Sequence, residues 1–141
     1  MDIKTAVHHV HSKFNYLADK KLYIGDGWFV MPERNQKMFG DCDDFAITSL
    51  WLACDENIFK FILNVFILHR YRLYHSKTVD GEAHIIGYAQ GLWFDNFTGE
   101  ALPEKQFFEK TKHKKWFFYP SPYILWFMLL GLFVRNMEVR P

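Results

Sequence analysis

The chain has 141 residues, of which 50% are hydrophobic and 19% aromatic, so it can bury a core and does not belong to the disordered class. At this length we expect one domain, residues 1–141. Seventeen basic and sixteen acidic residues leave a formal net charge of +1 without a basic stripe, which excludes a nucleic-acid-binding face.

The two cysteines, Cys42 and Cys54, are twelve residues apart. On one helix they would lie about 18 Å apart, beyond the reach of a disulfide. A reducing compartment is therefore permitted. The N-terminal stretch has no continuous apolar core, so we expect no signal peptide and a cytoplasmic or virion-associated protein, with peripheral membrane association left open.

Residues 2–20 have the period of an amphipathic helix. Its expected apolar face consists of Ile3, Val7, Val10, Phe14 and Leu17. Three histidines lie on the same segment, His8, His9 and His11. No acidic or cysteine residue at a suitable spacing completes a metal site with them, so we expect solvated histidines and no metal.

Residues 22–39 are rich in turn-forming residues. A turn is expected at 25–27, and Pro32 is expected to start a short helix. Trp28 and Phe29 are expected to pack beneath the loop that leads to Cys42. Trp28 has two compatible interpretations, a core aromatic that anchors this irregular segment and a wall of a substrate cleft.

Residues 40–47 place a cysteine where an apolar helical pattern begins. A helix that starts near Cys42 puts the sulfur at its N-terminus, where unpaired N–H groups and the macrodipole favour a thiolate nucleophile. The carboxylates of Asp41, Asp43 and Asp44 need solvent, which indicates that the helix begins at a cleft. They also oppose the thiolate, so a cationic partner must come from elsewhere. The alternative is a buried cysteine that only fills space.

Residues 59–75 are dense in β-branched and aromatic residues. From Leu68 onward they alternate in the way of a strand with one exposed face. Asp80 and Gly81 form a turn dipeptide that returns the chain into a second strand near Ala83.

Residues 83–88 and 92–96 read as two further short strands. If Ala89 and Gln90 form a two-residue loop, His84 lies directly opposite Asp95, with Cβ atoms about 4.5 to 5.5 Å apart. A carboxylate placed there fixes the tautomer of the imidazole and stabilises the imidazolium. Taken alone, this is better explained as an ordinary polar cross-strand pair. Together with Cys42 it supplies a nucleophile, a base and an orienting acceptor.

Four sequence boxes follow one another along residues 3–97. They are Trp28…Pro32-Glu33 (W-x3-P-E), the G-D-C-x-D-[FY]-A box at 40–46, the A-H-hydrophobic strand at 83–86 and the hydrophobic-D-N strand at 94–96. In these boxes the chain resembles the bacterial transglutaminase-like cysteine proteinases of the transglutaminase/papain-like superfamily. Family members are commonly larger and often exported, and small versions of this kind resemble proteins encoded by bacteriophages.

The resemblance implies an α+β fold in which the helix that carries the nucleophile packs on an antiparallel sheet. It implies a catalytic triad of Cys42, His84 and Asp95, and no metal or organic cofactor. Asp44 matches the acidic position of the box, as a structural or site-shaping carboxylate. The other residues expected to shape the site or line its cleft are Trp28, Asp41 and Asn96.

The C-terminal third begins with an expected polar connector at 97–109. A run of lysines at 110–115 then precedes an uncharged segment, 116–134, which Pro120 and Pro122 interrupt. Ser121 is expected to cap a helix that starts there. Its uninterrupted apolar part has twelve residues, about 18 Å of helix against a hydrocarbon core of about 30 Å. Core packing is favoured, with contact to a membrane or a protein partner left open.

These features predict a thiol hydrolase that cleaves an amide bond in a protein or peptide through an acyl-enzyme. Acyl transfer to an amine, and amide hydrolysis in cell-wall peptides, use the same triad and stay open. So does a non-catalytic binding or structural module that docks through the apolar segment 116–134. The sequence does not specify the oligomeric state.

Overall fold

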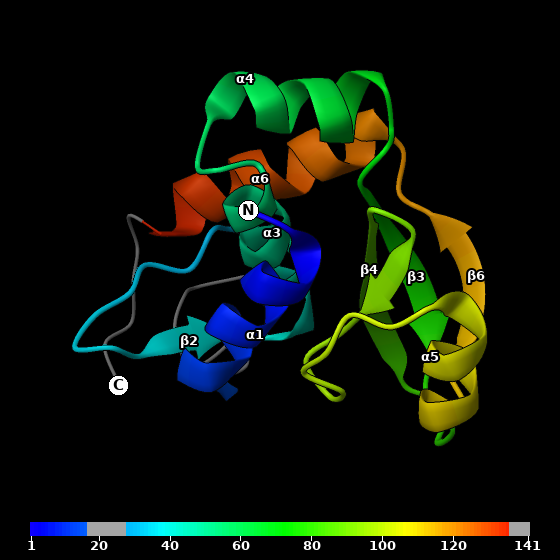
Figure 1. The fold of residues 1–141 in the computed structure, drawn as a ribbon. Coiled ribbons are helices and arrows are strands. Elements are labelled where there is room, and N and C mark those ends of the chain that lie inside the picture. The colour runs from blue at the N-terminus through cyan, green and yellow to red at the C-terminus, as the bar shows by residue number, and fades with distance from the viewer. Residues whose placement is uncertain (17–27, 136–141) are drawn as a thin grey trace.

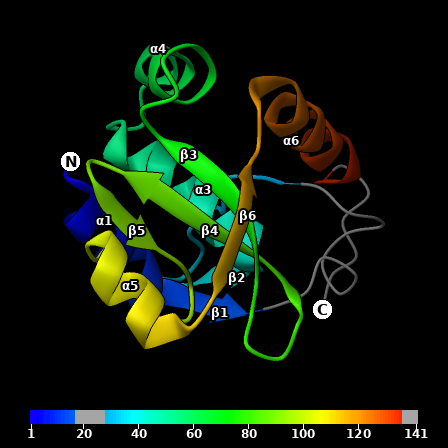
Figure 2. The same cartoon turned by 90° about the vertical axis from the view of Figure 1, so that its right-hand side faces the viewer.

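The computed structural model describes residues 1–16 and 28–135. Its centre is an antiparallel sheet with the strand order β5-β4-β3-β6. The strands are β3 (Arg72–Lys77), β4 (Ala83–Ala89), β5 (Leu92–Phe94) and β6 (Lys114–Phe118). Helices α1 (Ile3–Lys13) and α3 (Cys42–Ala53) lie on one side of the sheet and α5 (Glu104–Thr111) on the other (Figure 1 and Figure 2). The structure has the α+β class that was predicted.

The sheet divides the apolar core into two clusters. Leu73 and Ile85 belong to the cluster that includes the buried residues of α1 and α3. Their neighbours in sequence, Tyr74 and Ile86, belong to a second cluster with Phe107 of α5. Successive strand residues point to opposite faces, so each of these strands contributes to both clusters.

The predicted N-terminal helix is confirmed in its buried face but is shorter than expected. Its buried predicted residues are Ile3, Val7 and Val10. The helix ends at Lys13 instead of near residue 20, because Phe14 takes an extended conformation. From there β1 (Phe14–Tyr16) pairs in parallel with β2 (Met38–Gly40), and strand pairing replaces the last predicted turns of helix. The predicted face residue Leu17 lies outside the described residues.

The prediction of a helix at Pro32 is wrong. The chain makes a tight turn there, closed by backbone hydrogen bonds of 2.9 and 3.0 Å between Arg34 and Lys37. The two central residues, Asn35 and Gln36, have φ of 53° and 60°. Positive φ at both central positions is the hairpin geometry that matches the twist of paired strands. The turn predicted at 25–27 lies outside the described residues.

The apolar run after α3 is helical before it becomes a strand. Helix α4 (Ile58–Phe61) continues into the π-helical segment η1 (Ile62–Ile67). Asn57 caps α4 by accepting the first free backbone N–H groups at 2.9 and 3.1 Å. The predicted strand therefore begins at Arg72 and not at Leu68. His69 has a left-handed backbone (φ 52°), which interrupts an extended chain before that point.

Two hairpins build most of the sheet. The turn predicted at Asp80 and Gly81 is confirmed, and β3 and β4 pair antiparallel on either side of it. The predicted loop of Ala89 and Gln90 is wrong, because Ala89 pairs with Leu92 and the loop is Gln90 and Gly91. These two residues have φ of 54° and 79°. A type I′ loop needs positive φ at both positions, and glycine adopts it without steric cost.

The C-terminal third contains two elements that were not predicted. The expected connector at 97–109 includes the start of α5, and β6 adds an edge strand beside β3. Helix α6 (Ser121–Arg135) begins at the predicted Ser121. It buries Ile124 and exposes Trp126. Within residues 1–16 and 28–135, no helix combines the length and apolarity that crossing a membrane requires.

Candidate active site

Cys42 is the first residue of α3 and is partly exposed, so the predicted helix start is confirmed. The backbone N–H of the preceding Asp41 donates to Oδ2 of Asp44 at 3.2 Å, as in a capping box. Oδ1 of Asp44 accepts the backbone N–H of Phe29, also at 3.2 Å. Asp44 thus ties the segment next to Trp28 to the helix start. The sulfur lies at the positive end of the helix.

The prediction that the carboxylates beside Cys42 face solvent is wrong for two of the three, because only Asp41 is partly exposed. Asp43 and Asp44 are 5% and 0% exposed. Asp44 tolerates burial because both of its oxygens accept backbone N–H groups. One oxygen of Asp43 is buried and accepts no hydrogen bond from the described residues. Oxygens of Asp41, Asp43 and Asp44 lie within 4.8 Å of one another.

His84 lies at the second position of β4 and is 4% exposed. Its Nε2 is 2.9 Å from Oδ2 of Asp95. An ionised carboxylate only accepts, so Nε2 carries the proton and Nδ1 is the nitrogen left for a thiol. The ring of Phe97 stacks on the imidazole with centroids 4.5 Å and planes 7° apart. The carboxylate and the phenyl ring together fix the tautomer and the tilt of His84.

The strand register shows how His84 and Asp95 meet. Tyr88 pairs with Trp93, so Asp95, one residue past β5, follows on opposite Ile86 and not opposite His84. The predicted register is therefore wrong by two residues. An even shift keeps both side chains on one face of the sheet, whereas an odd one would separate them. The two residues are diagonal neighbours, which long side chains can bridge.

Asp95 is completely buried, and its carboxylate accepts three hydrogen bonds from the described residues. Its Oδ1 accepts the backbone N–H of Thr98 at 2.8 Å, and its Oδ2 also lies 2.7 Å from Nε2 of His113. Burial by itself raises the pKa of this carboxyl. The hydrogen bonds from His113, His84 and Thr98 outweigh burial and hold the pKa of Asp95 well below its ordinary value. Asp95 is therefore an anion at neutral pH.

His113 was not among the predicted site residues. It follows α5 and is 7% exposed. In the sequence, His113 stands out only as a histidine within the run of lysines that follows the expected connector. No spacing rule places it beside Asp95, because α5 and β6 bring it there and neither element was predicted.

Cys42 and His84 line two cavities together, of about 310 Å³ and about 270 Å³. Asn96 lines the first cavity. Trp28 and Asp41 line the second, where Trp28 is buried and the ring of Phe127 stacks on it with ring centroids 4.5 Å apart. Asp44 and Asp95 are completely buried and are not among the residues that line either cavity.

The second cavity is also lined by His75 and Tyr119, which were not predicted as site residues. Nδ1 of His75 is 3.1 Å from the hydroxyl of Tyr119. Burial raises the pKa of Tyr119, and negative charge on Cys42 raises it further, as expected for a phenol close to the sulfur. Tyr119 follows β6, so the unpredicted edge strand explains why sequence reasoning missed it.

The other cysteine, Cys54, ends α3 and is buried. Burial, and after it the charge of Asp55, raises the pKa of the Cys54 thiol to about 11. Cys54 is therefore a protonated core residue at neutral pH. The chain therefore has one partly exposed thiol at the start of α3 and one buried, protonated thiol at its end.

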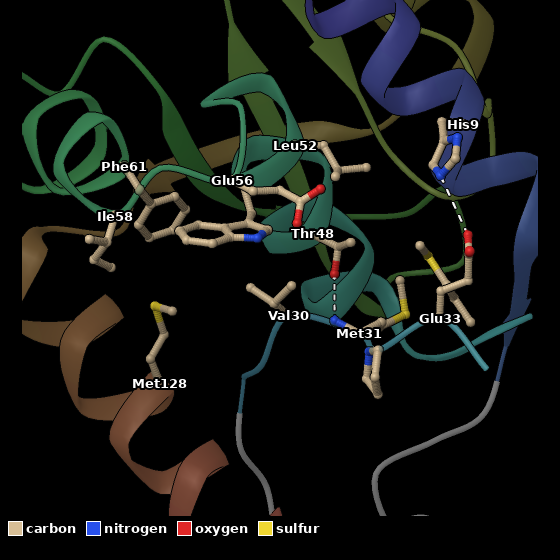
Figure 3. A pocket seen from close by; sticks show the side chains of 13 residues that line it. His9, Val30, Met31, Glu33, Thr48, Leu52, Glu56, Ile58, Phe61 and Met128 are labelled. Carbon is tan, nitrogen blue, oxygen red and sulfur yellow. Dashed lines mark hydrogen bonds and ion pairs between the residues drawn. The ribbon is translucent and has the colours of Figure 1, made fainter. Parts of the chain in front are cut away.

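A larger cavity, of about 560 Å³, lies elsewhere on the molecule. Its walls include Thr48 and Leu52 of α3, Phe61 of α4 and Met128 of α6 (Figure 3). Cys42 is not among the residues that line it. The larger cavity is therefore separate from the candidate active site, which consists of the two smaller cavities at Cys42.

No known family model and no curated protein matches the chain. Its fold is similar to solved structures of Legionella pneumophila LapG, among them an EGTA-treated and a calcium-bound form. Each comparison has a TM-score of 0.51 and 18% sequence identity and covers 84% of this chain. The chain spans 64% to 66% of the length of those LapG chains. At this level of identity the likeness establishes the fold, and the chain has a LapG-like α+β fold.

Proposed function

We propose that this protein is a cysteine hydrolase that cleaves an amide bond in a protein or peptide. The observation that carries the proposal is that Cys42 and His84 line the same cavities while the buried Asp95 holds Nε2 of His84 at 2.9 Å. This arrangement supports a nucleophile, a base and an orienting acceptor that act at one opening. LapG is a bacterial transglutaminase-like cysteine protease, which supports a protein substrate for this fold.

In the proposed reaction, Nδ1 of His84 takes the proton of the Cys42 thiol, and the thiolate attacks the substrate carbonyl carbon. Backbone N–H groups at the start of α3 stabilise the negative charge that develops on the carbonyl oxygen. The intermediate collapses, the C–N bond breaks, and the imidazolium gives its proton to the leaving amine. Water, deprotonated by His84, then attacks the thioester and releases a carboxylic acid and the free thiol. An amine in place of water would give acyl transfer.

Asp95 supports this cycle without changing its own charge. Its pKa lies far below neutral, so it stays ionised while His84 gains and loses a proton. The anion stabilises the imidazolium and keeps the Nε2 proton in place. That leaves Nδ1 as the only nitrogen of His84 that exchanges protons with the thiol.

His75 competes with His84 for the role of base, because it also lines a cavity with Cys42. Its Nδ1 faces the hydroxyl of Tyr119, a weaker partner for an imidazolium than a carboxylate. Burial, and after it the charge of Lys77, lowers the pKa of His75. We therefore assign the base to His84 and a substrate contact to His75.

The test is the rate of Cys42 alkylation by iodoacetamide as a function of pH, measured in a Cys54→Ala background. The expected result is a plateau that extends down to neutral pH, is lost in His84→Ala and is kept in His75→Ala. Loss of the plateau in His75→Ala alone would assign the base to His75. A titration near the ordinary cysteine value of about 8.5, unaffected by either change, would contradict the hydrolase and favour a non-catalytic module. An acetyl adduct on Cys42 after reaction with p-nitrophenyl acetate would report the acyl-enzyme.

We also propose that Asp41, Asp43 and Asp44 bind calcium next to the nucleophile. Their oxygens lie within 4.8 Å of one another, and one buried oxygen of Asp43 accepts no hydrogen bond from the described residues. Carboxylate oxygens are the ligands that Ca²⁺ prefers. LapG is known in a calcium-bound form. A cation held there would offset the carboxylate charges that oppose a thiolate at Cys42.

A further inference from the structure

His113 shares one oxygen of Asp95 with the proposed catalytic base. Nε2 of His113 lies 2.7 Å from Oδ2 of Asp95, and Nε2 of His84 lies 2.9 Å from the same atom. An ionised carboxylate has no proton to give, so both imidazoles donate. We infer that His113 is a positioning residue, which holds Asp95 ionised and in place for His84. The inference rests on the hydrolase proposed above.

Packing alone does not explain a histidine at this position. The ring of His113 lies near those of Phe97 and Phe107, with centroids 5.8 and 6.1 Å away. Its Nδ1 is buried and has no hydrogen-bond partner among the described residues. An apolar side chain would avoid this unpaired nitrogen. The hydrogen bond to Asp95 is the interaction that an apolar side chain cannot make.

The local backbone directs His113 toward the sheet. Lys112 ends α5 in a left-handed conformation (φ 60°), and the backbone N–H of His113 then donates to Oγ1 of Thr111 at 3.2 Å. Asp95 is consequently held from three parts of the chain. His84 approaches from β4, His113 from the segment between α5 and β6, and the backbone N–H of Thr98 from the loop after β5.

The charge of Asp95 depends on these donors because the carboxyl is fully buried. Its titratable hydrogen-bond partners are His84 and His113, and Thr98 contributes only a backbone N–H. Among the described residues, the rings in contact with His113 are the imidazole of His84, whose Nε2–H Asp95 already accepts, and the phenyl rings of Phe97 and Phe107, which carry no donor. Burial raises the pKa of Asp95, and the hydrogen bonds lower it. Without the N–H of His113 one of these bonds is lost, so the pKa rises and the carboxyl takes up a proton at a higher pH. The imidazolium of His84 then loses its counter-charge.

The experiment compares three substitutions at one position. His113→Leu removes the donor, His113→Gln retains an N–H at about the reach of Nε2, and His113→Asn carries the same amide on a shorter side chain. Phe108→Leu is the packing control, because Phe108 lies on α5 against Trp93 with ring centroids 5.2 Å apart. Each variant is made in the Cys54→Ala background.

Two quantities are measured in each variant. One is the midpoint of the acid limb of Cys42 alkylation by iodoacetamide, and the other is the 13Cγ chemical shift of Asp95 as a function of pH. We expect His113→Leu and His113→Asn to raise both midpoints, and that of Asp95 by about one pH unit, the size of effect that loss of one hydrogen bond to a carboxylate produces. We expect His113→Gln to restore the wild-type values and Phe108→Leu to keep them.

Equal midpoints in the wild type and His113→Leu would overturn the positioning role while leaving the hydrolase intact. If His113→Leu does not fold, equal midpoints in His113→Gln and His113→Asn would overturn it in the same way. A wild-type thiol without a neutral plateau contradicts the hydrolase itself, and with it the catalytic part of this inference.

Discussion

His84 and Asp95 are joined by a 2.9 Å hydrogen bond although the strand register does not place them opposite each other. Asp95 lies directly after β5 and is fixed by the turn that follows, where the backbone N–H groups of Thr98 and Gly99 donate to its Oδ1 and its carbonyl oxygen at 2.8 and 3.2 Å. The position of this carboxylate is therefore set by a loop at the strand end as well as by the sheet. Substitutions in that loop should therefore change how Asp95 orients His84, the proposed base.

The hydrogen bonds of Asp95 predict how stability depends on pH. Its pKa is lower in the folded protein than the value of about 3.9 in an unfolded chain, so its contribution to the free energy of unfolding is present above pH 4 and is lost as the pH falls below 4. We expect Asp95→Asn to cost about 1–3 kcal/mol at pH 7, because an amide has one acceptor oxygen and cannot accept both from the two imidazoles and from the backbone N–H of Thr98. The free energies of unfolding of the wild type and Asp95→Asn, measured in urea from pH 7 down to pH 3, should approach each other as the pH falls. A difference that stays constant over this range would mean that the ionised carboxylate contributes no stability.

Local patterns in the sequence were sufficient to predict several elements. The apolar run after Cys42 marked the start of a helix, Asp80 and Gly81 marked a hairpin, and Ser121 before Pro122 marked another helix start. Each signal acts through residues that are close in sequence, which is why it survives in the fold. The loop after β4 was predicted one residue too early, at Ala89 and Gln90, although Gly91 is the residue that a type I′ loop favours at its second position.

Other features depend on contacts between distant segments. The carboxylates beside Cys42 were expected in solvent, but Asp44 is buried because Phe29, fifteen residues away, supplies a backbone N–H. His113 reaches Asp95 only because α5 turns back against the sheet. The apolar residues after Asn57 resemble a strand in composition, but Asn57 caps a helix there and the backbone is helical in α4 and η1. Single-sequence patterns do not encode such partners.

The two cysteines are predicted to react very differently. Cys42 opens on cavities, whereas burial raises the pKa of Cys54 to about 11. At pH 7 the folded protein should take up one iodoacetamide, on Cys42, and a second only after unfolding in urea, as measured by intact mass. Cys42→Ala should remove the fast label and change the unfolding free energy little, because the side chain is partly exposed. Loss of several kcal/mol would show that Cys42 is a packing residue instead.

If the carboxylates of Asp41, Asp43 and Asp44 bind calcium, its removal should lower both the free energy of unfolding and the reactivity of the Cys42 thiol. Saturating Ca²⁺ at one hundred times its dissociation constant should stabilise the folded protein by about 2.7 kcal/mol, and EGTA should reverse the gain. Calcium should also increase Cys42 alkylation at neutral pH by reducing like-charge repulsion. Asp43→Asn is the matched variant, because it keeps the shape and removes one charge. Identical unfolding curves with Ca²⁺ and EGTA would rule out the site.

Gly87 on β4 is predicted to be essential for placing Asp95. A Cβ at this position would lie 2.2 Å from Cζ of Phe94, the buried residue that precedes Asp95. The phenyl ring is completely buried and has to shift within a packed core, so Gly87→Ala should lower the free energy of unfolding by about 1–3 kcal/mol. It should also slow Cys42 alkylation at pH 7, because a shift of Phe94 carries Asp95 away from His84.

Gly81→Ala is the control for that prediction. A Cβ there meets no atom within 4 Å, and only the left-handed backbone (φ 81°) opposes it. We expect it to cost about 1–2 kcal/mol and to leave the alkylation rate unchanged. Adding Phe94→Leu to Gly87→Ala should recover part of the lost stability, because the two sites are in direct contact and their effects are not additive. A wild-type alkylation rate in Gly87→Ala would mean that the turn at Thr98 holds Asp95 without help from Phe94.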